Sequence, residues 1–293
     1  ASSARGISTR SWRTDMRAAL VQLNVSDDPQ ENAVVAAARV REAAAGGATL
    51  VLTPEVTNIM SGSRSHQRAV LAHEEKDATL ATLRETAAAS GIWLLIGSLA
   101  LLTHDADGRF ANRSFLVGPD GEIRARYDKI HMFDVDLADG ESYRESAGFR
   151  PGDRAVVADA DGVRLGLTIC YDLRFPHLYR DLAKAGAQIL TVPAAFTVPT
   201  GRAHWHTLLR ARAIETGSFV LAPAQTGNHR VRSGPERRTF GHSLAVAPWG
   251  EILADAGEEP GITLVDLDLA AVERARKAVP SLGHDRPYAP PRA

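Results

Sequence analysis

The 293-residue sequence has one cysteine, Cys170, and only four lysines, Lys76, Lys129, Lys184 and Lys277. A single cysteine excludes an intrachain disulfide, and therefore a secreted disulfide scaffold, so we expect a reducing compartment, the cytoplasm. The sequence also lacks any apolar run near the roughly 18 residues that would span a bilayer. A membrane protein is therefore not expected.

The sequence also has no excess of positive or negative charge. The formal net charge is −1, and acidic and basic residues are interspersed along the chain. Nucleic acids and anionic membranes bind a concentrated basic face, so neither is expected as a partner. A chain of this length can bury a full core without disulfides or a structural metal.

The two ends differ in composition from the rest. Residues 1–15 are rich in Ser and Arg but have no apolar stretch, which excludes a secretory signal. We expect a disordered leader, a cloning remnant or an upstream extension there, with a transit peptide as the weaker alternative. Residues 16–286 are expected to form one domain, and the Pro-rich residues 287–293 an extended tail.

Hydrophobic periodicity predicts alternating helices and strands. Helices are expected at 29–45, 77–90, 176–185, 202–216 and 269–279. Strands are expected at 17–23, 49–52, 93–102, 114–117, 122–127, 156–158, 163–169, 189–192, 219–223, 243–246, 251–254 and 263–266. Because helices separate some strands while tight turns join others, the pattern predicts an α/β fold with mixed sheets. Residues 128–154 are polar and aperiodic, and a loop of that length is usually functional.

Cys170 follows the apolar strand 163–169 and precedes a helix that is expected to begin at Pro176. A thiol at a strand end lies at the sheet edge where α/β proteins bind ligands. The backbone N–H of Tyr171 would then face the same space and could stabilise an oxyanion. The alternative is a buried cysteine that only fills the core.

A nucleophilic thiol needs a base or a neighbouring cation. Lys129 follows a strand and is flanked by apolar residues, and the pKa of a lysine shifts readily on burial. Glu55 comes directly after a buried strand that Pro54 ends. Glu145 is a second acid, in the long polar segment. A surface lysine and a loop carboxylate remain the simpler interpretations of Lys129 and Glu55.

Three sequence blocks resemble the catalytic blocks of the carbon–nitrogen hydrolase (nitrilase) superfamily, in the same chain order. They are Pro54-Glu55, Asp128-Lys129-Ile130-His131 with Phe133-Asp134, and Ile169-Cys170-Tyr171-Asp172-Leu173-Arg174-Phe175-Pro176. The resemblance extends from about Met16 to Pro287 and includes Pro193-Ala194-Ala195-Phe196, His204-Trp205 and Gly241-His242-Ser243.

The resemblance implies a four-layer αββα sandwich that pairs through helices into a homodimer or a higher homo-oligomer. It implies a small-molecule amide as substrate, with Cys170 as nucleophile and Glu55 as the acid and base. Lys129 and the N–H of Tyr171 would stabilise the oxyanion, and Glu145 would position Lys129 or the substrate. No metal and no organic cofactor is implied.

Within the superfamily, the segment from Pro193 to Glu215 resembles the deaminated-glutathione amidase and ω-amidase branch. His206 departs from that pattern, which has Glu after His-Trp. Arg174 and Phe196 are the expected substrate-binding residues, although Arg174 could equally form a structural salt bridge. An N-carbamoyl amino acid hydrolase or a nitrilase with the same triad is the alternative.

Two other classes of function were weighed. A redox protein is disfavoured because Cys170 has no resolving cysteine. A non-catalytic scaffold is disfavoured because Glu55, Lys129 and Cys170 are all present. His131, His204 and His242 lack metal-ligand spacing, and His131 and His204 are expected to be structural. The tryptophans Trp205 and Trp249 are expected to pack.

Overall fold

Two six-stranded sheets form the centre of the structure, a computed structural model that describes residues 15–136, 140, 142–232, 236–289 and 291. The first sheet has the order β16-β1-β2-β3-β4-β5 and the second β15-β14-β11-β10-β9-β8. The first sheet comprises β1 (Asp15–Gln22), β2 (Leu50–Leu52), β3 (Trp93–Leu101), β4 (Ala111–Val117), β5 (Ile123–Asp128) and β16 (Gly261–Asp268). The second comprises β8 (Val156–Ala160), β9 (Val163–Leu167), β10 (Ile189–Thr191), β11 (Phe219–Ala222), β14 (Leu244–Val246) and β15 (Ile252–Asp255).

Both sheets are mixed, as predicted. Strand β2 runs parallel to β1 and β3, and β10 runs parallel to β9 and β11, while the outer pairs are antiparallel. The central strands β2 and β10 have three residues each and are buried throughout, which is typical of strands covered on both sides.

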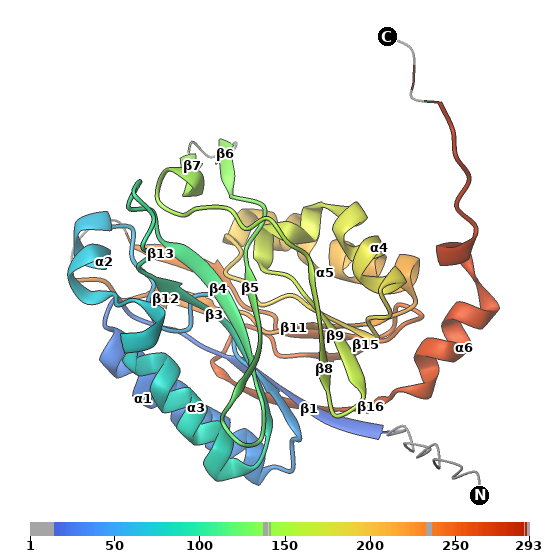
Figure 1. Ribbon diagram of the computed structural model, residues 1–293, viewed down its shortest axis with the longest axis horizontal. Coiled ribbons are helices and arrows are strands. Elements are labelled where there is room, and N and C mark those ends of the chain that lie inside the picture. The colour runs from blue at the N-terminus through green and yellow to red at the C-terminus, as the bar shows by residue number, and fades with distance from the viewer. Residues whose placement is uncertain (1–14, 137–139, 141, 233–235, 290, 292–293) are drawn as a thin grey trace, which may run out of the picture.

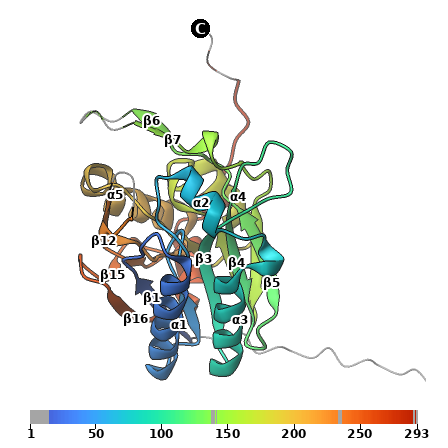
Figure 2. The ribbon, with the colours of Figure 1, turned by 90° about the vertical axis from the view of Figure 1, so that its left-hand side faces the viewer.

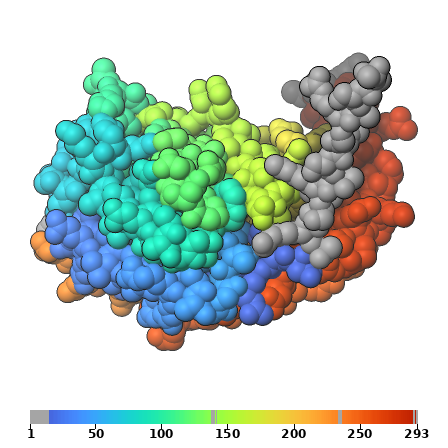
Figure 3. Space-filling model, turned by 60° about the horizontal axis from the view of Figure 1, so that its bottom comes forward, coloured from blue at the N-terminus to red at the C-terminus, as the bar shows by residue number. Residues whose placement is uncertain are grey.

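Helices cover the outer face of each sheet (Figures 1 and 2). The first sheet packs against α1 (Pro29–Ala45) and α3 (Ala78–Ser90), and the second against α4 (Pro176–Lys184) and α5 (Val198–Thr216). The N-terminal part of the chain forms most of the surface on the side of α1 and α3 (Figure 3). The four layers therefore follow the order α, β, β, α, as expected.

Alternation along β1 shows how the layers are built. Ala18 and Leu20 lie in the cluster that fills the space between the sheets, while Ala19 and Val21 lie in the cluster beneath α1 and α3. Because successive side chains of a strand point to opposite faces, one apolar strand can serve both layers.

Capping residues explain why the helix bounds could be predicted. The carboxylate of Asp28 accepts hydrogen bonds from the N–H groups of Gln30 and Glu31. Pro29 begins α1 at a position where a backbone N–H would have no partner within the helix. Asp77 caps α3 in the same way through Leu80 N, and Gly91 ends it with φ of 63°.

Several short elements were not predicted. The polar segment 128–154 contains the hairpin β6 (Asp134–Asp136) and β7 (Ser142–Arg144), followed by a 3₁₀ turn, η2 (Glu145–Ala147). Helix α5 begins four residues earlier than expected. Helix α2 (Arg64–Val70) and the hairpin β12 (Thr226–His229) with β13 (Arg237–Phe240) carry too few apolar residues to show a period.

The ends of the chain are described only in part. Strand β1 begins at Asp15, one residue before the expected domain start, and residues 1–14 lie outside the described part. After α6 (Ala270–Ala278) and η4 (Ser281–Gly283), residues 284–289 have no secondary structure. Among the described residues, no helix combines the length and hydrophobicity that crossing a membrane requires.

Candidate active site

The three side chains of the expected triad meet at one end of the sandwich. Glu55 follows β2, Lys129 follows β5, and Cys170 comes after β9 as the first residue of the 3₁₀ helix η3 (Cys170–Arg174). The two sheets approach closely here: a Cβ on Gly97, in β3, would lie 2.5 Å from Cβ of Pro193, which follows β10 of the second sheet. Only glycine fits at position 97, and its lack of a Cβ lets the backbone just before Glu55 lie close to the site.

Lys129 lies between two carboxylates. Its Nζ is 2.9 Å from Glu55 Oε1 and 2.9 Å from each oxygen of Glu145. The side chains of Lys129 and Glu55 are 2% and 6% exposed, so these contacts are largely shielded from water. Asn112 donates its Nδ2 to Glu55 Oε1 at 2.9 Å, and Phe133 N donates to Glu145 Oε2 at 2.7 Å.

The backbone of Cys170 is held in an unusual conformation. Its φ is 50°, a left-handed value that costs a non-glycine residue energy, and its N–H donates to Pro193 O at 2.9 Å. Its side chain lines the same cavity as Glu55, Lys129 and Ala195. Val56, next to Glu55, has a φ of 48°. Strain of this kind is concentrated at functional sites.

Burial and neighbouring charge set the protonation of the resting site. Burial raises the pKa of the Cys170 thiol well above its usual value, and the Glu55 carboxylate raises it further. Burial would also raise the pKa of Glu55, but the attraction of Lys129 outweighs it and lowers that pKa. The pKa of Lys129 is raised, because Glu145 and Glu55 outweigh its burial. The resting site thus holds a thiol, a carboxylate and an ammonium group.

Asp172 fixes the turn that carries the cysteine. This fully buried carboxylate accepts Tyr127 Oη at 2.7 Å, Ile169 N at 2.8 Å and His131 N at 3.0 Å. The imidazole of His131 lies 2.7 Å away through Nδ1 and stacks on Phe175. The structural role expected for His131 is confirmed, and the block after Cys170 is tied to the block around Lys129.

A cavity of about 350 Å³ opens onto these groups. Glu55, Lys129, Glu145, Cys170 and Tyr171 all line it. Its walls include the apolar side chains Val56, Ile59, Met60, Phe133, Phe149 and Phe196 and the arginines Arg64, Arg144 and Arg237. Such a space suits a small organic molecule with a negatively charged group.

The two expected substrate-binding residues are placed differently. Phe196 lines the cavity, whereas Arg174 does not. The guanidinium of Arg174 lies 5.6 Å from the ring centroid of Phe196 and 5.9 Å from that of Tyr171, and 3.3 Å from His204 Nδ1. Arg174 thus lies beside two aromatic residues of the cavity wall, and its contact with the substrate stays a prediction. Trp205 is buried as expected, but Trp249 is 58% exposed in the single chain.

Three polar residues of the site were missed as site residues. Asn112 lies in β4 and bonds Glu55. Gln225 follows β11 and donates its Nε2 to Glu55 O at 2.9 Å. Arg237, in β13, lines the cavity and donates to Ala195 O at 2.8 Å, and its buried Nε has no partner among the described residues. Single polar residues in short strands carry no local signal of such a role.

The four-layer sandwich, with a thiol, a carboxylate and an ammonium group at the base of a cavity, defines a nitrilase-like fold. The chain belongs to the carbon–nitrogen hydrolase family, whose profile matches residues 17–277. It is accordingly a hydrolase that acts on carbon–nitrogen bonds other than peptide bonds.

Relatives of known activity match nearly the full length. The chain is 39% identical over 270 residues to a deaminated glutathione amidase of Yersinia enterocolitica, covering 92% of each chain. It is 36% identical over 267 residues to the human omega-amidase NIT2, covering 91% of this chain and 94% of that one.

Solved structures show the same fold. The NitFhit protein of C. elegans matches with a TM-score of 0.85 and 33% identity over 94% of this chain and 66% of that chain. A mutant amidase of Nesterenkonia matches with a TM-score of 0.72 and 31% identity over 90% of this chain and 94% of that one. In that amidase, the acetamide moiety of fluoroacetamide is covalently added to the active-site cysteine.

Proposed function

We propose that the protein is a thiol amidase that uses Cys170, Glu55 and Lys129 to hydrolyse the amide of a small carboxylic acid. One observation carries this proposal: Cys170, Glu55 and Lys129 line one ligand-sized cavity, where Glu55 Oε1 lies 2.9 Å from Lys129 Nζ. A base and a cation thus stand next to the only thiol of the chain.

Acylation follows from the resting charges. Glu55 takes the proton of Cys170 as the sulfur attacks the amide carbonyl carbon, because the raised pKa of the thiol keeps it protonated until then. Lys129 Nζ and the N–H of Tyr171 stabilise the oxyanion. Glu55 then returns the proton to the leaving nitrogen, and the carbon–nitrogen bond breaks to give ammonia or an amine and a thioester.

Hydrolysis of the thioester uses the same groups. Glu55 removes a proton from water, whose oxygen attacks the thioester carbonyl, and Cys170 leaves with that proton restored to its sulfur. Glu145 holds Lys129 from the opposite side throughout, with both oxygens 2.9 Å from Nζ. Lys129 is thereby oriented toward the oxyanion instead of being paired with Glu55 alone. No step needs a metal or a cofactor.

Arg237 is the residue we propose to bind the carboxylate of the substrate. Its Nε is buried with no partner among the described residues, and an unsatisfied buried donor is costly. A carboxylate in the cavity would accept that hydrogen bond. Arg64 and Arg144 are already engaged by Ala147 O and by Asp136. Phe196 would contact the apolar part of the substrate, and Arg174 would hold Phe196.

Deaminated glutathione is the substrate we propose first, and 2-oxoglutaramate second, because relatives with both activities match along nearly the whole chain. The test is the release of ammonia or amine from these two amides, an N-carbamoyl amino acid and a simple nitrile. Cys170→Ala and Glu55→Gln should abolish turnover, while Glu42→Gln, at an exposed surface pair, should leave it unchanged.

A substrate preference for the carbamoyl compound or the nitrile would keep the thiol mechanism and overturn the choice of branch. Turnover that survives Cys170→Ala would overturn the mechanism itself. Loss of turnover in Glu42→Gln as well would show that the losses reflect damage to the fold, which circular dichroism of each variant measures independently.

We also propose a homodimer in a reducing compartment such as the cytoplasm. Trp249 is 58% exposed, Ile214 of α5 is 54% exposed, and Ile252 and Leu253 of β15 are 45% and 42% exposed. Ile214 lies next to the backbone of Gly250, the residue after Trp249, and exposed apolar side chains that gather on one face commonly mark an interface. Light scattering should give twice the chain mass, and Trp249→Ser with Ile214→Asp should return the monomer.

A further inference from the structure

A second group of chemically active side chains lies outside the cavity. His73 and Glu75 lie at the 3₁₀ turn η1 (Glu74–Lys76), and His104 lies in the loop after β3. One possible ligand atom from each of the three lies within 4.8 Å of the other two. None of the three lines the cavity of the catalytic groups. We refer to them as the His73–Glu75–His104 cluster.

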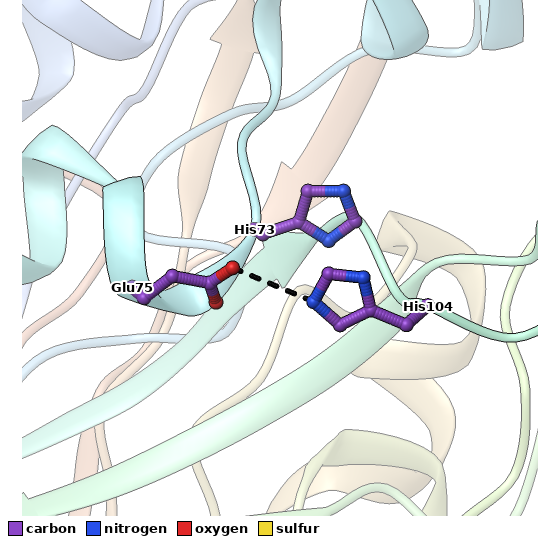
Figure 4. A group of neighbouring side chains, drawn as sticks. All are labelled: His73, Glu75 and His104. Carbon is purple, nitrogen blue, oxygen red and sulfur yellow. Dashed lines mark ion pairs between the residues drawn. The ribbon is translucent and has the colours of Figure 1, made fainter.

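The backbone brings the two histidines together. His73 and Leu102 form an isolated parallel bridge, and Leu102 N donates to Ala72 O at 2.9 Å. The imidazole rings consequently lie face to face, with centroids 4.1 Å apart and planes 2° from parallel. Figure 4 shows the carboxylate of Glu75 pointing at the ring of His104. Glu75 Oε1 lies 3.4 Å from His104 Nε2. Because imidazole lone pairs lie in the ring plane, an ion shared by both histidines requires the exposed His104 ring, at 77% exposure, to turn out of the stack toward His73 and Glu75.

His73 supplies an independent observation. Its Nδ1 is buried and has no hydrogen-bond partner among the described residues. A buried polar atom without a partner is costly, and it commonly marks an unfilled ligand position. Coordination through Nδ1 would give this atom its partner. Glu75 is suited to the same role, because its carboxylate oxygen lies 3.4 Å from His104 Nε2.

We propose that the His73–Glu75–His104 cluster binds a divalent transition-metal ion, with Zn²⁺ as the best fit. Two imidazole nitrogens and one carboxylate oxygen are ligands that Zn²⁺ prefers, and solvent can complete a tetrahedral set. The ion would join η1 to the loop after β3. It is a stabilising site away from the catalytic cavity, and folding does not depend on it.

Ion pairs next to the cluster connect both of its segments to Asp128, the residue before Lys129. Glu74, between two of the ligands in sequence, pairs with Arg113 and Arg126, and Arg113 in turn pairs with Asp128, the residue before Lys129. Asp105, next to His104, pairs with Arg150, which also reaches Asp128. Both segments joined by the ion therefore lead through ion pairs to the strand end that positions Lys129.

A second group with comparable chemistry serves as the matched control. His206, His242 and Asp255 also bring three possible ligands together. There, however, the two imidazoles bond the carboxylate at 2.8 and 2.9 Å and Gly257 N bonds it at 3.0 Å. Asp255 is satisfied without an ion, so we assign no metal to this group.

The experiment measures Zn²⁺ binding by calorimetry to the full-length, untagged chain after chelator treatment. All variants carry Cys170→Ala, so that the catalytic thiol cannot ligate the ion. We expect a single equivalent of Zn²⁺ to bind and to raise Tm. Glu75→Gln and His104→Ala should weaken binding at least about tenfold, the effect of losing a ligand, and His206→Ala should not. Co²⁺ should give visible d–d absorption bands that vanish in His104→Ala.

The exposed positions of Glu75 and His104 make these variants safe for folding, and circular dichroism checks that they are folded. Absence of binding would overturn the proposal. So would binding that is unchanged in His104→Ala, or binding that is lost in His206→Ala instead, since the ion would then lie elsewhere. Equal binding of Zn²⁺ by every variant would identify only adventitious surface contacts.

Discussion

Replacing Lys129 with methionine tests the electrostatic account of the site. The ammonium group lies 2.9 Å from Glu55 and from both oxygens of Glu145, and its side chain is 2% exposed. Lys129→Met fills a similar volume but leaves two facing carboxylates without their cation. Breaking a buried ion pair from one side costs about 3–5 kcal/mol. At roughly 2–4 °C per kcal/mol, the expected fall in Tm is about 6–20 °C.

The pH dependence of that loss has a definite sign. In the parent protein the pKa of Glu55 lies below its ordinary value of 4.5, so this carboxylate contributes stability above pH 4.5 that is lost as pH falls through the folded-state pKa. Lys129 has a raised pKa and contributes stability fully below its ordinary 10.5, lost only as pH rises through the folded-state pKa. Without Lys129, burial raises the pKa of Glu55, so the variant should approach the parent in stability as the pH falls.

Urea unfolding at pH 7.5 and pH 5 measures both effects. Lys129→Met with Glu145→Gln removes the cation and one carboxylate together and should recover part of the loss. Lys277→Met, at an exposed position of α6, is the matched control and should change stability little. A loss below about 1 kcal/mol for Lys129→Met, the range of an exposed pair, would refute the reasoning.

The remaining predictions concern activity and the support of the nucleophile. Arg237→Leu should raise KM for a carboxylate-bearing amide at least about tenfold, with a smaller change in kcat, because losing a hydrogen bond to a charged group costs about 1.5–3 kcal/mol. Arg238→Leu, at the exposed neighbouring position, is the control. Equal KM values for the parent and Arg237→Leu would refute the proposal that Arg237 binds the substrate carboxylate. Asp172→Asn should lower the free energy of unfolding by about 3–5 kcal/mol, because the buried carboxylate that three or more donors share is lost. Thermal unfolding measures this change. A difference within experimental error would contradict the role of Asp172 in holding the turn that carries Cys170. Because burial raises the pKa of the Cys170 thiol, alkylation of the free enzyme by iodoacetamide should keep rising with pH beyond the range of an ordinary thiol. A plateau of the alkylation rate near neutral pH would reveal a resting thiolate and contradict the protonation described above.

The helix bounds and the mixed α/β character could be predicted from local patterns, whereas the four layers and the triad were implied by the resemblance. The bounds of α1 follow from the Asp28 cap, Pro29 and Gly46, all within one helical turn of its ends. Glu55 and Cys170 could be placed because each follows an apolar strand. Their convergence on Lys129 could only be inferred from resemblance, since it depends on β2, β5 and β9 ending at the same end of two packed sheets.

Other features of the site could not be predicted from local sequence patterns. The hairpins β6–β7 and β12–β13 are short and polar, and the second brings Arg237 to the cavity although it lies far from the triad in sequence. The resemblance implies a cation that binds the substrate carboxylate, and Arg174 was the candidate. In the structure, its guanidinium lies beside the rings of Tyr171 and Phe196, and Arg174 is not among the residues that line the cavity.

The most direct test of the central claim is to trap the acyl-enzyme. The protein is mixed with deaminated glutathione or 2-oxoglutaramate, quenched in acid during turnover, and examined by intact mass and peptide mapping. We expect a transient mass increase equal to the acyl group, located on Cys170, that is absent in Cys170→Ala. Turnover without any adduct, continuing in Cys170→Ala, would contradict a mechanism that passes through a thioester on Cys170.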